Sequence, residues 1–192
     1  LAADGIAAAA FLNTFVAAAA AMIAWLAVEW IKDGHPTTLG ACSGAVAGLV
    51  AITPCAGFVG GLAPVYIGLG VGVVCYFAIS LKYKFGYDDS LDVVGVHLVG
   101  GLFGTLALGL FADATINPLV VDEGLFLGGG TALLVDQAIA AAAVIAFAFV
   151  ATMIIGKLID LTIGLRVSEG DEQVGLDQSQ HAESGYNLAD HS

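Results

Sequence analysis

Long stretches without any charged residue alternate with short polar segments along this chain. Positions 5–28, 34–81, 93–112 and 137–156 contain no Asp, Glu, Lys or Arg. A helix that crosses the core of a bilayer needs about 20 mostly apolar residues, and the second stretch is long enough for two such helices. We therefore predict an all-α, polytopic membrane helix bundle over residues 1–165, with spans at about 6–29, 38–55, 62–81, 92–112 and 133–157.

Proline and glycine mark the place where the long uncharged stretch divides. Five of them fall within 53–64: Pro54, Gly57, Gly60, Gly61 and Pro64. These residues favour turns, so we expect a tight turn there. Residues 166–192 are acidic, polar and poor in aliphatic side chains, which predicts a tail that cannot form a core of its own.

The composition agrees with a membrane protein. Hydrophobic residues make up 59% of the chain and charged residues 11%, and the mean hydropathy is +0.94, far from a soluble domain. The 26 glycines are typical of closely packed membrane helices. The formal net charge is −12 with only five Lys and Arg residues, which argues against nucleic acid as a partner.

The positions of the basic residues predict the orientation. All of them follow odd-numbered spans and therefore fall on one side of the bilayer: Lys32, Lys82, Lys84, Lys157 and Arg166. The positive-inside rule places that side in the cytoplasm, with the first residues outside and the tail inside. A division into four or six spans would break this segregation. An odd number of spans with no internal repeat also leads us to expect that part of the transport path is missing from this chain.

His97 is the candidate functional residue. An ionisable side chain inside a membrane helix is costly and usually lines a cavity or meets a partner. Gly100, Gly101 and Gly104 follow it, and small residues let helices approach closely. We expect a pore beside a glycine seam, although a core histidine bonded to a backbone carbonyl is the alternative.

Two neighbours of His97 have expected roles. Val93 lies one helical turn before it on the same face. Asp92 is expected to cap the helix or to anchor the preceding loop, and Ser90 could cap it in the same way. The chemistry of the site depends on the imidazole, because a neutral ring offers one hydrogen-bond donor and one acceptor.

Three separated motifs resemble the ammonium transporter (Amt/Mep/Rh) family. Residues 92–104 read DVVGVHLVGGLFG and resemble the penultimate helix of that family. Residues 32–54 read KDGHPTTLGACSGAVAGLVAITP and resemble its signature segment. Residues 160–167, DLTIGLRV, with Gly175-Leu-Asp177, are similar to the end of the last helix and the regulatory tail of bacterial members.

This resemblance implies a fold of eleven spans, of which this chain supplies the last five. It implies a homotrimer in the plasma membrane, with one pore per subunit for ammonium, ammonia or methylammonium. His97 would be the second of two pore histidines, the first lying on an earlier helix, and Val93 would belong to the apolar pore wall. The fragment alone is not expected to conduct.

The resemblance also implies a regulatory tail. Its cytoplasmic partner would be a PII-type nitrogen-regulatory protein. The tail residues that match the family are Gly164, Arg166, Gly175, Leu176 and Asp177. We expect docking for 164–177 and disorder for the last dozen residues, and we expect Lys82 and Lys84 to attract the tail acids Glu169, Asp171 and Glu172.

Other functions are less well supported by the sequence. An Rh-type ammonia or carbon dioxide channel and a membrane ammonium sensor are the alternatives within the family. An enzyme is not expected, because no HExxH, no GxSxG and no carboxylate pair occurs within a span. Cys42, Cys55 and Cys75 lack the spacing of a metal site, and no cofactor is expected.

Overall fold

The computed structural model describes residues 2–185 and divides into two units, Leu1–Ala143 and Val144–Ser192. Every regular element of the described residues is helical, which confirms the predicted all-α fold. The elements are α1 Gly5–Asp33, α2 Thr38–Ile52, α3 Ala63–Ile79, α4 Leu81–Phe85, η1 Val93–Leu98, α5 Val99–Phe111, η2 Leu125–Leu127, α6 Ala132–Thr162, α7 Glu169–Val174 and α8 Leu176–Ser179.

The five predicted spans correspond to five helical segments, but one of them is shorter than expected. Four segments are long and apolar enough to cross a bilayer: Gly5–Asp33, Ala63–Phe85, Val93–Phe111 and Ala132–Thr162. The span predicted at 38–55 is corrected, because α2 has only 15 residues and is therefore about 22 Å long.

The chain after α2 continues as a turn that is partly buried in protein. Cys55 and Val59, both in this turn, are fully buried. Irregular backbone at membrane depth is tolerated where protein covers it. The turn predicted between residues 53 and 64 is found there, since α2 ends at Ile52 and α3 begins at Ala63.

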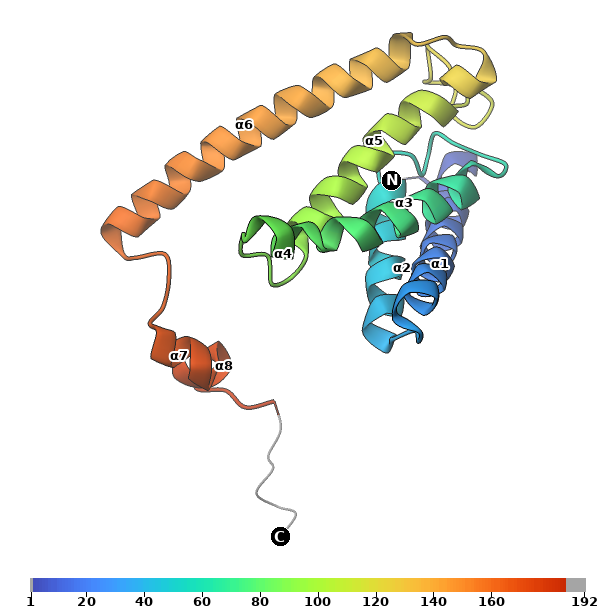
Figure 1. The fold of residues 1–192 in the computed structure, drawn as a ribbon. Helices are drawn as coiled ribbons and strands as arrows, with labels where there is room; N and C mark the ends of the chain where they lie inside the picture. Colours follow the sequence, from blue (N-terminus) through green and yellow to red (C-terminus); the bar gives the residue numbers. More distant parts are fainter. Residues whose placement is uncertain (1, 186–192) are drawn as a thin grey trace. The chain divides into compact units, whose positions relative to one another are not determined.

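Helix α1 packs against both α2 and α3 (Figure 1), and glycines of α2 and α3 lie very close to its backbone. A Cβ atom added at Gly48 of α2 would lie 2.5 Å from the carbonyl oxygen of Ala17. One added at Gly72 of α3 would lie 2.5 Å from the carbonyl oxygen of Ala21. Such contacts allow van der Waals packing of backbone on backbone, the main source of helix association in lipid.

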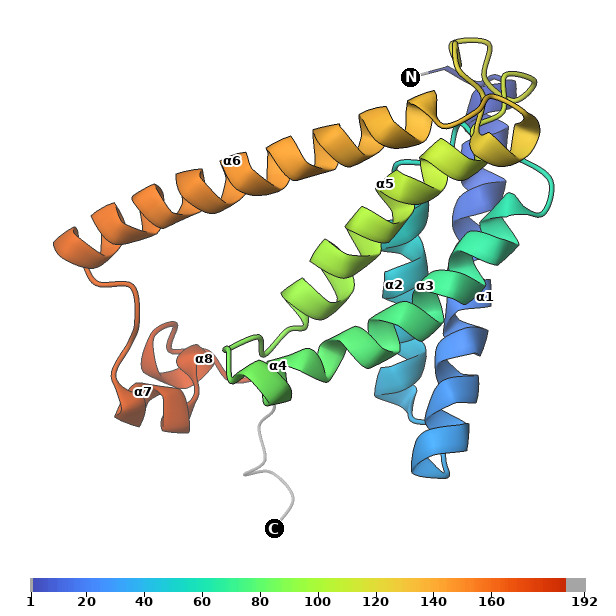
Figure 2. The same cartoon turned by 45° about the horizontal axis from the view of Figure 1, so that its top comes forward.

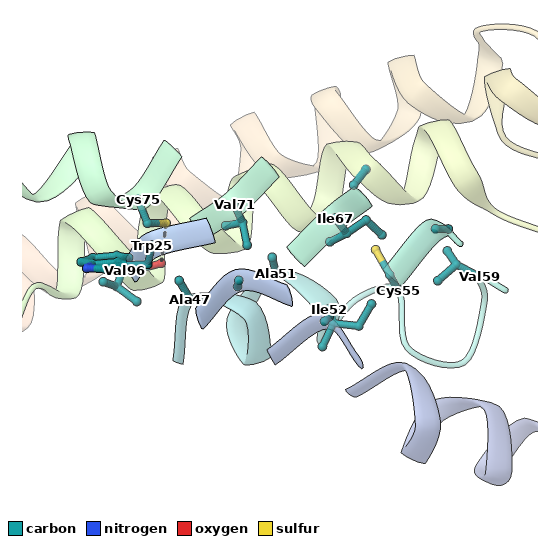
Figure 3. Packing of buried hydrophobic residues seen from close by; sticks show 14 residues of the cluster. Trp25, Ala47, Ala51, Ile52, Cys55, Val59, Ile67, Val71, Cys75 and Val96 are labelled. Carbon is teal, nitrogen blue, oxygen red and sulfur yellow. Dashed lines mark hydrogen bonds between the residues drawn. The ribbon is translucent and has the colours of Figure 1, made fainter. Parts of the chain in front are cut away.

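Helix α5 packs against α2 and α3 in the same way (Figure 2). A Cβ atom at Gly104 would overlap the carbonyl group of Ala51. The thiol of Cys55 donates a hydrogen bond to the carbonyl oxygen of Gly104, at 3.1 Å. Figure 3 shows the small and branched side chains that fill the space between these helices, among them Ile52, Val71 and Cys75.

Two buried asparagines hold the turn between α2 and α3. The amide of Asn13 donates to the carbonyl oxygens of Ala56 and Val59, at 2.9 and 2.7 Å. The amide of Asn117 donates to the carbonyl oxygen of Gly57, at 3.1 Å. These bonds satisfy backbone groups that would otherwise be unpaired away from water.

The opposite end of the bundle carries Lys32, Lys82 and Lys84, and we call it the lysine end. Here Glu29, which is 9% exposed, accepts hydrogen bonds from the backbone N–H and the hydroxyl of Thr37, both at 2.8 Å. The Thr37 hydroxyl accepts the N–H of Gly40, which caps α2.

The residues at the start of the segment 32–54 therefore have a structural role. A Cβ atom at Gly40 would collide with the Glu29 carboxylate, so a larger residue there would displace this carboxylate from its hydrogen bonds to Thr37. His35 is exposed in the connecting turn, with its Nδ1 atom 3.1 Å from the carbonyl oxygen of Asp33.

The second unit contains the rest of α6 and the tail. No residue of α6 is buried, and large apolar side chains such as Phe147, Phe149 and Leu161 are exposed along it. Such a surface is stable only against lipid or other protein. The short helices α7 and α8 follow.

Closely packed and open glycines should respond differently to one added methyl group. Gly104→Ala would force apart α5 and α2, a form of overpacking that costs about 1–3 kcal/mol. Gly156→Ala is the matched control, because a Cβ atom there meets nothing within 4 Å and alanine is the better helix former. Thermal unfolding of the purified protein in detergent should show a lower midpoint for Gly104→Ala only. Equal midpoints for both variants would contradict this packing.

Candidate functional site

His97 lies in a π-helical turn, which the sequence pattern did not reveal. This turn, η1, precedes α5 directly. The N–H of Val99 is shared between the carbonyl oxygens of Val94, five residues back, and Val96, three residues back, where an α-helix would use the residue four back. Single π-helical turns frequently occur at functional sites.

Asp89 caps this turn, and not Asp92 as we expected. The Asp89 carboxylate accepts the backbone N–H groups of Val93 at 2.7 Å, Val94 at 3.0 Å and Gly95 at 3.4 Å. Asp92 makes no side-chain cap and lies in the left-handed region, with φ 56°. The capping prediction for Asp92 was therefore wrong.

Asp92 instead contacts a residue of the preceding segment, which is compatible with the alternative role in anchoring the loop. Its carboxylate is 2.7 Å from the ammonium group of Lys82, which also donates to the carbonyl oxygen of Asp89 at 3.0 Å. The hydroxyl of Ser90 donates to Asp88 at 3.3 Å and does not cap the helix. An aspartate a few residues before an apolar run is the sequence signal that could have suggested Asp89.

One side of η1 is buried and the other is open. Gly95 and Val96 are buried, and a Cβ atom at Gly95 would lie 2.8 Å from the Ile79 side chain of α3. Val93 is 53% exposed and His97 is also exposed. The structure thus brings Val93 and His97 to one open face, as their spacing predicted.

The three glycines after His97 do not have the same surroundings. Gly104 is pressed against α2, and a Cβ atom at Gly100 would lie 3.3 Å from Val50 and 3.5 Å from the sulfur of Cys75. At Gly101 the nearest atom is 4.0 Å away. Gly100 and Gly104 therefore have the packing role we expected, whereas Gly101 lies one turn from His97 with room to spare.

The His97 ring has no hydrogen-bond partner among residues 2–185. This differs from the alternative of a core histidine bonded to a backbone carbonyl. By contrast, none of the buried side-chain nitrogen and oxygen atoms in the described part of the chain lacks a partner. The imidazole is a polar group on an apolar helix whose donor and acceptor are both available to something outside this chain.

A cavity of about 340 Å³ opens at the lysine end. Its lining includes Trp25 and Glu29 of α1, Tyr76 of α3, and Asp92. The Tyr76 hydroxyl donates to Asp33 at 2.6 Å, and the Trp25 and Tyr76 rings meet edge to face at 5.6 Å. Because the acids here have partners, the cavity has a structural explanation in the contacts that join α1, α2 and α3.

The tail residues that matched the family occupy turns and helix ends. Gly164 and Gly175 have φ values of 82° and 97°, which favour glycine. Arg166 pairs with Glu172 through two nitrogen–oxygen contacts of 2.7 and 3.2 Å. Leu176 begins α8, which also contains Asp177.

The tail contains two short helices, α7 and α8, both of which lie before the last dozen residues, where we expected disorder. None of residues 166–185 is buried, so these helices have no core of their own, as expected. The last residues, 186–192, lie outside the described part, and the expectation of disorder there stays a prediction. Glu172, which we had expected near Lys82 or Lys84, pairs with Arg166, and this hydrogen bond lowers the pKa of the Glu172 carboxyl.

Apolar helices joined through glycine contacts, together with an available imidazole on an open helix face, define a polytopic helical membrane protein. The model of the Ammonium Transporter Family matches residues 1–186, and the chain belongs to that family. It is 49% identical over 184 residues to an ammonium transporter of Bacillus subtilis, covering 95% of this chain and 45% of that protein.

Solved structures give the same result for the fold. The crystal structure of Mep2 from Candida albicans is similar with a TM-score of 0.78 at 34% identity, covering 86% of this chain and 38% of that one. A structure described as a sensor Amt protein has a TM-score of 0.79 at 26% identity, covering 94% of this chain and 43% of that one. The chain thus spans less than half the length of each of these relatives.

The order of the tail should depend on pH through Glu172. Since the bond to Arg166 lowers this pKa, the pair is intact above the usual glutamate pKa and is lost as pH falls through the lowered value. Hydrogen-exchange protection of α7, corrected for intrinsic rates, should fall by about twofold across that window. Glu172→Gln should abolish this dependence, and Glu183→Gln, which removes a charge outside α7, should preserve it. An unchanged dependence in Glu172→Gln would contradict the assignment.

Proposed function

We propose that this chain forms part of a transmembrane path for ammonium or ammonia, with the open face of Val93 and His97 as its lining. The observation that carries the proposal is the His97 ring, which is exposed and has no partner among the described residues of an otherwise apolar helix. Such a group can bind a small amine that must leave water. Membership of the ammonium transporter family supports this substrate.

In this proposal the path is completed by protein outside this chain. A second imidazole pairs with His97 and fixes which ring nitrogen holds the proton. Val93 supplies an apolar wall, and Gly101 leaves space one turn away. The whole protein is a homotrimer in the plasma membrane, its lysine end is cytoplasmic, and a PII-type regulator binds on the cytoplasmic side.

A sensor is the second candidate, because one similar structure is described as a sensor Amt protein. A sensor would bind ammonium without moving it across the membrane. An Rh-type channel would differ in substrate, passing ammonia or carbon dioxide. Transport and binding must therefore be measured separately, in the same preparation.

The test uses a full-length chimera in which this whole chain replaces the matching segment of the Bacillus subtilis relative. His97→Ala should reduce the maximal rate of methylammonium uptake into vesicles by about two- to tenfold, the effect of losing one hydrogen bond. His35→Ala is the matched control, because His35 lies exposed in a turn, and its rate should be unchanged. Equal rates for both variants, or binding without uptake by the unmodified chimera, would overturn the transport proposal.

The proposed orientation can be tested by chemical labelling. In a chimera without other cysteines, His35→Cys should react with a membrane-impermeant maleimide only from the cytoplasmic side, because it lies at the lysine end. Leu119→Cys, at a position 79% exposed in the loop at the other end, should react only from outside. The reverse pattern would refute this topology.

A further inference from the structure

We propose that Asp89 is a positioning residue for His97, because its carboxylate sets the π-helical turn that aims the imidazole. This inference rests on the proposed function of His97. Asp89 is 9% exposed and holds three consecutive N–H groups, those of Val93, Val94 and Gly95. It does so from a position three residues before Asp92, the residue that directly precedes the turn.

An ordinary N-cap differs from this arrangement. The capping side chain normally belongs to the residue just before the helix and accepts an N–H two or three residues further on. Here that place belongs to Asp92, whose left-handed backbone turns the chain and whose side chain binds Lys82. Lys82 also binds the carbonyl oxygen of Asp89, so one ammonium group holds both ends of the 89–92 loop. The loop therefore places the Asp89 carboxylate next to the free N–H groups of the first turn.

The link from Asp89 to His97 passes through Val94. The N–H of Val94 binds the carboxylate, and the carbonyl oxygen of Val94 accepts the N–H of Val99. The backbone ring that this bond closes contains His97. In an α-helix Val99 would instead bind the carbonyl oxygen of Gly95. The side chains within the turn would then point in other directions around the axis.

The contacts of the turn and of α5 with neighbouring helices determine what a change from π to α geometry would do to His97. Gly95 lies against Ile79 of α3, and Gly104 lies against Ala51 of α2. The helix axis is thus fixed by its neighbours, so a change from π to α geometry cannot be absorbed by moving α5. It changes the direction of the His97 ring relative to the open face.

Asp89 could instead serve only to stabilise the fold, and the two roles predict different results. A residue that acts through His97 loses its effect when His97 is absent, whereas a folding residue does not. The experiment therefore combines Asp89→Asn with His97→Ala in the chimera. Asp88→Asn is the matched control, because it removes the same charge from the adjacent exposed position.

We expect Asp89→Asn to reduce the maximal rate of methylammonium uptake per molecule by about three- to tenfold when His97 is present. We expect no further reduction in the His97→Ala background, and little change in Asp88→Asn. An equal reduction by Asp89→Asn with and without His97 would overturn the positioning role. Failure of the unmodified chimera to transport would instead count against the proposed function.

A second measurement does not depend on transport. Diethyl pyrocarbonate modifies accessible imidazoles, and peptide mass spectrometry reads each histidine separately. The modification rate of His97 should change severalfold in Asp89→Asn and stay constant in Asp88→Asn, while the rate of His35 stays constant in both. An unchanged His97 rate in folded Asp89→Asn protein would refute the proposal, even if His97→Ala transports too little for the first comparison.

Discussion

The contact of helix backbones without intervening side chains is the constraint on which this bundle depends. In lipid, apolar side chains gain little by leaving one apolar environment for another, so helices associate through close van der Waals contact. Gly48 of α2 and Gly72 of α3 both provide this contact with α1, against the carbonyl groups of Ala17 and Ala21. A methyl group at either glycine would separate the helices and weaken every contact along the interface. The position of α1 therefore determines where α2 and α3 can lie.

The same constraint reaches the candidate site. Gly104 places α5 on the backbone of α2, and Gly95 places the π-helical turn on Ile79 of α3. These two contacts fix the helix on its buried side. What remains free is the direction of side chains on the open face, where His97 and Val93 lie. In our proposal, the hydrogen bonds of Asp89 set the direction of these side chains.

The helices could be predicted because charge is excluded from the bilayer core, and their number followed from the charge gaps. The exact end of α2 at Ile52 was less clear, because apolar residues continue beyond it, although Pro54 disfavours a helical conformation of the residue before it. The common face of Val93 and His97 was also predictable from spacing alone.

The π-helical turn and its cap were beyond the sequence pattern for a different reason. Asp89, Ser90 and Asp92 are all residues that can cap a helix, and the sequence does not tell which carboxylate reaches the free N–H groups. That choice depends on Lys82, which binds Asp92 at 2.7 Å and leaves Asp89 to the helix. The spacing of hydrophobic residues likewise cannot show whether the N–H groups of a single turn bind the carbonyl group four residues back or five residues back.

The distribution of satisfied polar groups supports a functional reading of His97. Glu29 binds Thr37, Asp33 binds Tyr76, and Asp89 binds three backbone N–H groups. In the described part of the chain, every buried side-chain nitrogen and oxygen atom has a partner. An imidazole without a partner on an apolar helix lowers stability wherever lipid or protein, and not water, covers it. That cost is understandable if another molecule or segment completes the hydrogen bonds of the ring. The same ring lies on a turn whose hydrogen bonding departs from that of an α-helix. Three hydrogen bonds to one carboxylate stabilise this turn, as is expected where the direction of a side chain matters.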